Sequence, residues 1–262
     1  MTLLEFQELM KKENLSEEEK KILEPYRVKR AVILAAGLGI RLRPLTNDKP
    51  KPLITVNGVR IIDTIIEALN KNGIDEIYII RGYKAEAFDD LINKYPNIHM
   101  LNNVVYDQGN NILSMGVAGN LLAGAYVMPA DLYIVNPSVF STYQYCSNVL
   151  GYKVSESDDW CIETDEKRVI KRLSPGGTNC HKDAGVFYWN EKDGLQLSKD
   201  IAAACKNKEN WQRFWCTVPF DICKDNYASV LRECEEGDII EIDTVEELIA
   251  LDSAYHKVIS DD

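Results

Sequence analysis

The residues that could do chemistry gather first in residues 31–54, AVILAAGLGIRLRPLTNDKPKPLI. An apolar run leads into Gly37 and Gly39, two arginines follow, and Lys51 stands between two prolines. Glycines let backbone N–H groups approach phosphate oxygens, and arginine and lysine side chains neutralise those oxygens. The prolines restrict the backbone around Lys51 and so present its ammonium group. The stretch predicts a phosphate-binding loop, and a solvated basic loop is the weaker alternative.

The same glycines do not complete a dinucleotide-binding turn. That turn has the pattern G-x-G-x-x-G, in which the third glycine lets helix and strand pack closely. Here the third position is Leu42, and the second predicted strand ends in Arg81 and Gly82 rather than in a ribose-binding acid. An NAD-type oxidoreductase is therefore disfavoured.

Strand and helix patterns alternate around and after this loop. We expect strands at 30–36, 75–82, 97–103 and 124–131, and helices at 60–73, 85–96 and 110–122. The order predicts a Rossmann-like α/β fold with an open, mixed, mostly parallel sheet flanked by helices. After residue 136 the patterns are short and rich in aromatic residues, which predicts a small antiparallel cover layer. A helix at 193–206 and a strand–helix pair at 238–255 complete the predicted fold.

The N-terminal residues 2–24 predict two short amphipathic helices, the second capped by Ser16 with Glu19. We divide the chain into an N-terminal helical segment at 1–28 and a main domain at 29–262. The sequence leaves three roles possible for this segment: a lid, an oligomerisation arm, or the remnant of a helix-turn-helix module.

The composition excludes some function classes. Lys and Arg number 30 and Asp and Glu 41, so the net charge is −11 and a nucleic-acid partner is disfavoured. The seven cysteines contain no C-x-x-C pair, which favours free thiols over a zinc site or a disulfide framework. No apolar run reaches the length of a membrane span, so we expect a cytoplasmic protein without membrane insertion.

The segment LAAGLGIRLRPLTNDKPKPLI resembles the signature L-A-A-G-x-G-x-R, spacer, P-K-x-L of the nucleotidyltransferases. Within that superfamily the chain resembles the bacterial CTP:phosphocholine cytidylyltransferases, through segments such as NNVVYDQGNNILSM, YVMPADLYIVN and IIEIDTVEEL. The resemblance implies the nucleotidyltransferase fold, which is GT-A-like. It also implies an enzyme that transfers CMP from CTP to phosphocholine, with Mg²⁺ as cofactor and pyrophosphate and CDP-choline as products. The sequence does not decide whether the protein forms a homo-oligomer or belongs to a longer fused chain.

The resemblance also implies roles for individual residues near the nucleotide. The backbone of Ala36, Gly37 and Gly39 would cradle the triphosphate, with Arg41 on its outer phosphates and Lys51 at the α-phosphate. Asp131 and Asp243 would hold Mg²⁺, and Glu241 could assist; a strand-end cap and a helix N-cap are the structural alternatives for the two aspartates.

Two asparagines are the candidates for base selection, and three aromatic residues are the candidates for acceptor binding. Asn110 and Asn111 carry the donors and acceptors that the edge of cytosine needs, but asparagine also caps helices. The resemblance places Trp160, Tyr188 and Trp215 at family positions that line the choline site. Aromatic faces suit that role because they bind quaternary ammonium groups.

The sequence departs from the family pattern at one position of the acceptor region, so alternatives remain for the acceptor and for the class of function. Relatives show Tyr-Trp-Asp where this chain has Phe-Trp-Cys, ending at Cys216, so an acid is missing. The acceptor 2-aminoethylphosphonate is the alternative within the same chemistry. A non-catalytic sensor that binds a nucleotide or a choline compound is the alternative of another class.

Overall fold

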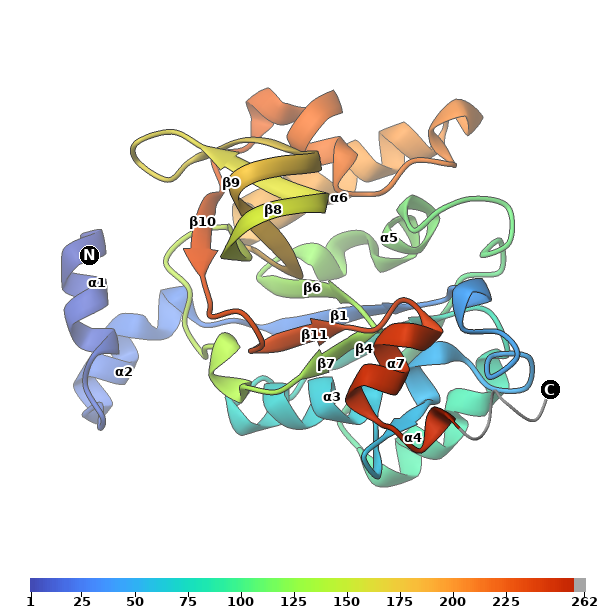
Figure 1. The fold of residues 1–262 in the computed structure, drawn as a ribbon. Coiled ribbons are helices and arrows are strands. Elements are labelled where there is room, and N and C mark those ends of the chain that lie inside the picture. The colour runs from blue at the N-terminus through green and yellow to red at the C-terminus, as the bar shows by residue number, and fades with distance from the viewer. Residues whose placement is uncertain (257–262) are drawn as a thin grey trace.

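A seven-stranded sheet in the order β10-β8-β9-β6-β1-β4-β5 forms the centre of the computed structural model, which describes residues 1–256 (Figure 1). Its strands are β1 (Arg30–Ala35), β4 (Ile77–Arg81), β5 (Ile98–Asn102), β6 (Ala125–Pro129), β8 (Asn148–Thr164), β9 (Ile170–Trp189) and β10 (Val230–Glu233). The pairs β1–β4, β1–β6, β4–β5 and β8–β10 are parallel, whereas β9 is antiparallel to both of its neighbours. The predicted mixed, mostly parallel α/β fold is confirmed.

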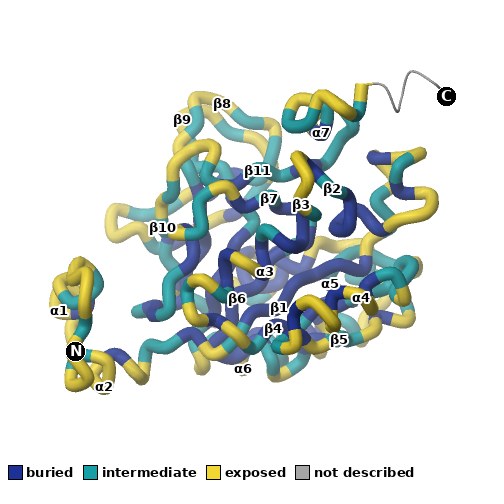
Figure 2. Tube along the Cα trace, turned by 90° about the horizontal axis from the view of Figure 1, so that it is seen from below, coloured by how far each residue is buried: buried dark blue, intermediate teal, exposed yellow. Residues whose placement is uncertain are grey.

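Helices cover both faces of this sheet, which explains why β1 is apolar from Ala31 to Ala35. The covering helices are α3 (Ile61–Lys71), α4 (Asp89–Lys94), α5 (Ile112–Ala118) and α6 (Glu191–Cys205), whereas α7 (Val245–Leu251) packs in a separate cluster with Ile61 and Ile242. Ala31 and Ile33 pack in a core cluster with α3 and α4, whereas Val32 and Leu34 pack in a second cluster with α5 and α6. Successive side chains of a strand point to opposite faces, so both sets are buried, and Figure 2 shows β1 in the buried interior.

A small antiparallel sheet joins two distant parts of the chain beside the main sheet. Strand β7 (Leu132–Ile134) pairs with β11 (Ile239–Glu241), and the Ile242 N–H donates to the Asp131 carbonyl at 3.1 Å. This pairing places the residues just before β7 next to the residues just after β11. A two-residue hairpin, β2 (Thr55–Val56) and β3 (Val59–Arg60), precedes α3.

The long antiparallel pair β8–β9 is continuous with the main sheet. The end of β9 pairs with β6 through Val127 with Phe187 and Ala125 with Trp189. Beyond that contact the two strands extend as a ribbon above the sheet (Figure 1). The antiparallel part of the fold is therefore an extension of the sheet edge as well as a cover.

The N-terminal helices α1 (Leu3–Met10) and α2 (Glu17–Leu23) stand to one side of the body (Figure 1). Both begin with a capping box, so the predicted start of α2 at Ser16 is confirmed. The pair contacts the rest of the chain through its own small cluster, in which Phe6 and Leu23 pack with Tyr143. The boundary at residue 28 stays a prediction. In residues 1–256, none of the helices combines the length and the apolar character needed to cross a membrane.

Candidate active site

The loop after β1 has its shape because position 39 is a glycine. Gly39 has φ +61°, a left-handed conformation that side chains disfavour. A Cβ there would lie 3.0 Å from Thr46 Cγ2 and 3.2 Å from Lys51 Cβ, and the Thr46 hydroxyl donates to the Gly39 carbonyl at 2.7 Å. The loop therefore folds back on itself and brings Lys51 under the glycine segment.

Replacing Gly39 tests this packing. Gly39→Ala is expected to lower the melting temperature by about 3–8 °C, because it combines a strained φ with close contacts. Gly37→Ala is the matched control, since a Cβ at Gly37 meets nothing within 4 Å. Thermal melts of both variants in the absence of ligand provide the measurement. Equal melting temperatures for the two variants would contradict the role given to Gly39.

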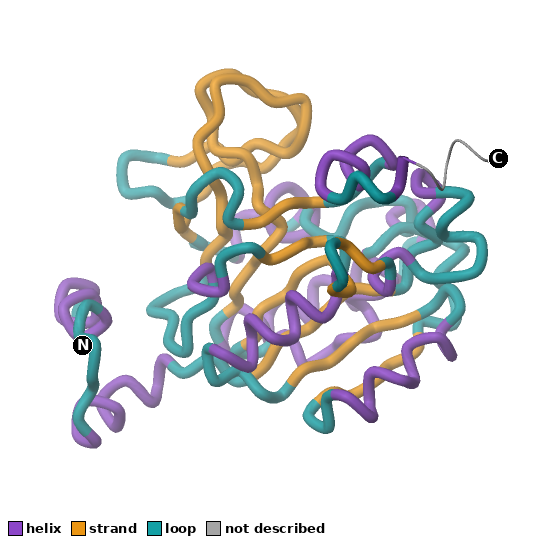
Figure 3. The backbone as a smooth tube through the Cα atoms, turned by 60° about the horizontal axis from the view of Figure 1, so that its bottom comes forward, coloured by secondary structure: helices purple, strands orange, loops and turns teal. Residues whose placement is uncertain are grey.

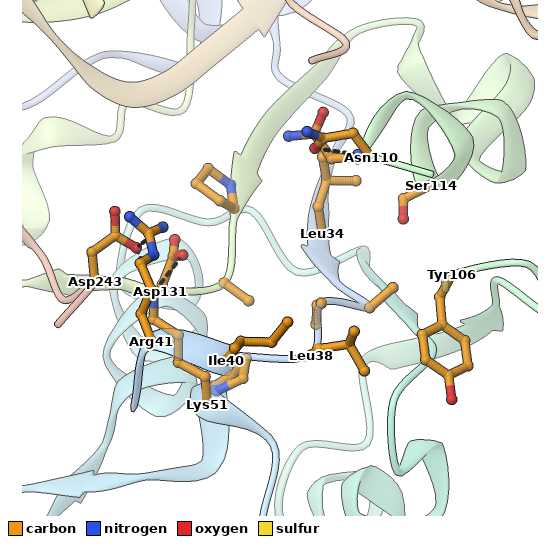
Figure 4. A pocket seen from close by; sticks show the side chains of 18 of the residues that line it. Leu34, Leu38, Ile40, Arg41, Lys51, Tyr106, Asn110, Ser114, Asp131 and Asp243 are labelled. Carbon is orange, nitrogen blue, oxygen red and sulfur yellow. Dashed lines mark hydrogen bonds and ion pairs between the residues drawn. The ribbon is translucent and has the colours of Figure 1, made fainter. Parts of the chain in front are cut away.

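Lys51 is buried between two carboxylates. Its residue is 8% exposed, and its Nζ lies 2.8 Å from Asp131 Oδ2 and 2.7 Å from Asp243 Oδ1 (Figure 4). Burial alone would lower the pKa of the Lys51 ammonium, but attraction to the two aspartates outweighs this and raises the pKa. Lys51 is therefore charged at neutral pH, and its ammonium group is held at a fixed place.

Three carboxylates surround this ammonium group. One ligand oxygen from each of Asp131, Glu241 and Asp243, which we call the acidic trio, lies within 4.8 Å of the other two. Burial first, and then repulsion from the two aspartates, raises the pKa of Glu241 to about 8. Arg41 adds a second positive charge, with its Nη2 2.8 Å from Asp243 Oδ1. Lys51 and Arg41 together pair with the two aspartates, whereas Glu241 forms no ion pair among the described residues.

The trio has the donor chemistry of a hard divalent cation. Asp131 Oδ1 is buried and has no hydrogen-bond partner among the described residues. Mg²⁺ prefers carboxylate oxygens together with phosphate oxygens and water. An unpaired buried oxygen beside two further carboxylates therefore fits such an ion. For Asp243 the alternative of an N-cap is removed, because Thr244 caps α7 by accepting the Glu247 N–H.

The raised pKa of Glu241 predicts a pH-dependent stability in the absence of a metal. The folded pKa lies above the ordinary value of 4.5, so the stabilisation is fully present below that value and is lost as pH rises through about 8. We expect the free energy of unfolding to fall between about pH 5 and pH 8, and Glu241→Gln to remove most of that fall. Denaturant unfolding across this range measures the slope, with exposed Glu166→Gln as the control. An unchanged slope in Glu241→Gln would contradict this electrostatic account.

A cavity of about 530 Å³ connects the charged group to the start of α5. Its lining includes Ala36, Gly37, Gly39, Arg41, Lys51, Asn110, Asn111, Ser114, Asp131 and Asp243. The structure thus brings together every residue predicted for the triphosphate, the base and the metal. Figure 4 shows Lys51, Arg41 and the two aspartates at one end and Asn110 with Ser114 at the other. Their roles toward a ligand stay predictions.

The two asparagines are positioned by backbone groups rather than by capping α5. The Asn111 N–H donates to Asn110 Oδ1 at 2.7 Å, and the Trp215 N–H donates to Asn111 Oδ1 at 2.8 Å. Neither side chain caps the helix at its N-cap position, which is Asn111. Both oxygens are thus used within the protein, which leaves the two side-chain NH₂ groups as the donors available at the cavity.

The structure does not bring the three predicted acceptor aromatics into one group. Tyr188 is 3% exposed and packs against Tyr126 in the core cluster of the α3 face. Trp215, also 3% exposed, and Trp160 pack with the cluster of the α5–α6 face. The sheet separates Tyr188 from the other two, because alternate residues of β9 point to opposite faces. A cage formed by all three rings is incompatible with this packing.

A second cavity, of about 340 Å³, adjoins the first at Asp243 and has an acidic lining. Among its described lining residues Tyr152 is the single aromatic side chain, and the charged ones are Asp159, Lys182, Asp183, Glu236, Glu241, Asp243 and Glu247. Burial raises the pKa of Asp183 to about 7, and its Oδ1 accepts the Gly185 N–H at 2.8 Å. This cavity shares Glu241 and Asp243 with the acidic trio.

Sequence reasoning missed several lining residues of both cavities. Ser114 lies one helical turn after Asn110 and Asn111, so helical periodicity could have identified it. Tyr106 and Gln212 also line the first cavity, and Asp183 lines the second. No local pattern marks Gln212 or Asp183, because their placement depends on how distant segments fold together.

Comparisons with known proteins agree with this geometry. The family model described as "Nucleotidyl transferase" matches residues 30–143. The chain is 34% identical to the 2-aminoethylphosphonate cytidylyltransferase of Lancefieldella rimae, over 86% of this chain and 92% of that protein. It is 30% identical to the choline-phosphate cytidylyltransferase of Streptococcus pneumoniae, over 83% of this chain and 94% of that protein.

A solved structure supports the same assignment. The CTP:phosphocholine cytidylyltransferase from Streptococcus pneumoniae superposes with a TM-score of 0.81 and 31% identity, covering 87% of this chain and 99% of that one. Both the fold and the sequence are therefore shared along most of the chain. The chain belongs to the nucleotidyl transferase family, among its bacterial cytidylyltransferases.

Proposed function

We propose that the protein transfers CMP from CTP to phosphocholine, with release of pyrophosphate and formation of CDP-choline. The observation that carries this proposal is the buried Lys51, held between Asp131 and Asp243 at the end of a cavity that begins at the glycine loop. The relatives named for choline-phosphate and 2-aminoethylphosphonate transfer support a small phosphorus-bearing acceptor.

In the proposed reaction a phosphate oxygen of the acceptor attacks the α-phosphorus of CTP. The new P–O bond forms as the bond from the α-phosphorus to the bridging oxygen breaks, and that oxygen leaves with pyrophosphate. The backbone of Ala36, Gly37 and Gly39 binds the triphosphate, and the Lys51 ammonium faces the α-phosphate, where negative charge develops. Arg41, which is exposed at the cavity, contacts the outer phosphates. The side-chain NH₂ groups of the two asparagines donate to the edge of cytosine.

We propose that the acidic trio holds Mg²⁺, chiefly through Asp131 and Asp243. The ion, when bound, neutralises phosphate charge and orients the triphosphate. Lys51 contacts both aspartates, so its positive charge holds these two like charges close together. A non-catalytic sensor has no need of this arrangement, and the enzyme is therefore favoured over it.

The acid-lined second cavity favours 2-aminoethylphosphonate as a second candidate acceptor. A primary ammonium group has three N–H donors and needs acceptor oxygens, which Asp159, Asp183 and Glu236 offer. A quaternary ammonium group relies on aromatic faces, and Tyr152 is the one that the described lining provides. The acid absent at Cys216 is supplied nearby by Asp183, whose charge acts on the Cys216 thiol.

Pyrophosphate release with CTP and Mg²⁺ distinguishes the two acceptors when they are offered in parallel. Turnover with phosphocholine is expected, and Asp183→Asn is expected to raise the KM of the acceptor by about tenfold while leaving the KM of CTP unchanged. Asp90→Asn, exposed on α4, is the control. Turnover with 2-aminoethylphosphonate alone would reassign the acceptor. Binding of CTP without turnover on either acceptor would overturn both candidates.

A further inference from the structure

Two thiols face each other in the β8–β9 ribbon. Cys161 Sγ lies 2.7 Å from Cys180 Sγ, and the two residues are 19 positions apart in the chain. Cys161 is 2% exposed, whereas Cys180 is partly exposed to solvent. Their separation matches no C-x-x-C pattern, so the pairing depends on the tertiary fold.

The ribbon brings the thiols together because it curls back on itself. Cys161 pairs with Ser174 in one part of β9 and with Lys182 in another, and Cys180 pairs with Val154. The register shifts along β8–β9, and Figure 3 shows the outer halves of the strands as a ring that stands away from the sheet. The segment around Cys161 therefore lies between two parts of the same partner strand.

A glycine provides the space that the two sulfur atoms occupy. A Cβ at Gly177 would lie 3.0 Å from the Sγ atoms of both Cys161 and Cys180. Real Cβ atoms rarely approach other atoms so closely, so a larger residue there would push the sulfur atoms aside. The absence of a side chain at position 177 thus lets the two sulfur atoms lie together.

The thiol pair lies two residues along each strand from lining residues of the second cavity. Asp159 precedes Cys161 by two positions, Lys182 follows Cys180 by two, and these charged side chains form an ion pair at 3.0 Å. Both line the second cavity together with Asp183. A covalent link between the cysteines would hold the two strands that carry these lining residues.

We propose that Cys161 and Cys180 form a reversible disulfide, made by exchange with a low-molecular-weight disulfide, that fixes the ribbon wall of the second cavity. The Cys180 thiolate attacks one sulfur of the small disulfide, forms a mixed disulfide and expels one thiolate. The Cys161 thiolate then attacks the Cys180 sulfur and expels the second. Two electrons pass to the small disulfide, the two protons of the protein thiols end on the released thiols, and one S–S bond replaces another.

The difference in exposure sets this order of attack. Cys180 is reachable from solvent, whereas burial, and then contact with Cys180, raises the pKa of the Cys161 thiol to about 12. Burial keeps external reagents away from Cys161, whereas the Cys180 sulfur lies only 2.7 Å from its own sulfur. In the described part of the chain, the other cysteines whose thiols contact a partner contact backbone carbonyls, such as Cys205 with Ile112 and Cys234 with Gly151.

The test treats the 262-residue chain with oxidised glutathione and maps its peptides without reduction. We expect a Cys161–Cys180 cross-link that dithiothreitol reverses, and a rise in the melting temperature of about 5 °C or more from closing this loop. Cys161→Ser is expected to stop at a glutathione adduct on Cys180, whereas Cys180→Ser gives neither adduct nor cross-link at this site. Cys234→Ser is the control and keeps the cross-link.

Cross-linking that involves other cysteines, or an adduct on Cys180 in the wild-type protein without closure, would overturn the proposal.

The consequence for activity rests on the proposed function. The oxidised protein is expected to lose kcat/KM for the acceptor while keeping its affinity for CTP, because the acceptor enters past the fixed ribbon. An unchanged acceptor kcat/KM in the fully cross-linked protein would overturn that consequence. Peptide mapping needs no turnover, so failure of the proposed reaction would be recognised separately.

Discussion

Lys51→Ala is expected to lower kcat for CMP transfer by about 10²- to 10³-fold, which is the range found for removal of one preorganised charge-stabilising donor. The Lys51 ammonium is buried and contacts Asp131 and Asp243, so its position is fixed before substrate binds. The developing charge at the α-phosphate would then meet a cation that needs no reorganisation. Steady-state measurement of kcat and of the KM for CTP, with Mg²⁺ in excess, provides the test.

Lys49→Ala is the matched control, because Lys49 lies in the same loop and is exposed. It is expected to keep nearly wild-type kcat. Loss of Lys51 also leaves two carboxylates without their partner, so the variant should be less stable in the absence of a cation, and circular dichroism must first establish its fold. A folded Lys51→Ala protein with full turnover would contradict the role proposed for this lysine.

Asp131→Asn is expected to lower kcat by about 10²-fold or more and to raise the Mg²⁺ concentration needed for half-maximal activity. The substitution keeps the size of the side chain but removes its charge. It also replaces one carboxylate oxygen at a residue whose buried Oδ1 has no hydrogen-bond partner among the described residues. Titration of pyrophosphate release with Mg²⁺ measures both effects in one experiment.

The control for this variant is Asp90→Asn, an exposed substitution on α4. It should leave both the rate and the Mg²⁺ midpoint unchanged. The decisive comparison is the midpoint. A lower rate with an unchanged midpoint would mean that Asp131 acts by positioning Lys51 alone, and the proposed metal site would then be wrong.

The sheet could be predicted from the sequence because local patterns carry that information, and residues named from the sequence meet in the first cavity. The apolar run of β1, its glycines and Lys51 are close together in the chain, whereas Asp131 and Asp243 are named from the family resemblance. For Asp243 the sequence left an N-cap as the alternative. The structure separates the two possibilities because the neighbouring Thr244 caps α7.

The acceptor side could not be predicted in the same way. Tyr188 and Trp215 were predicted to line the acceptor site because they are aromatic and match family positions. The register of β9, which the sequence does not reveal, places Tyr188 on the α3 side of the sheet, in the core. Asp183 has no local signal, because it comes to the second cavity through the curled β8–β9 ribbon. The register shifts of that ribbon depend on tertiary packing rather than on its alternating pattern.

In the proposed reaction the acceptor oxygen attacks the α-phosphorus of CTP at the Lys51 end of the first cavity. Phosphorus-31 NMR of the complete reaction, with CTP, Mg²⁺ and either phosphocholine or 2-aminoethylphosphonate, tests it most directly. Attack at the α-phosphorus predicts pyrophosphate and, in equal amount, a new resonance pair for the α-phosphorus of CTP coupled to the phosphorus of the acceptor. Formation of CDP with free phosphate, or of CMP without a coupled acceptor resonance, would contradict it.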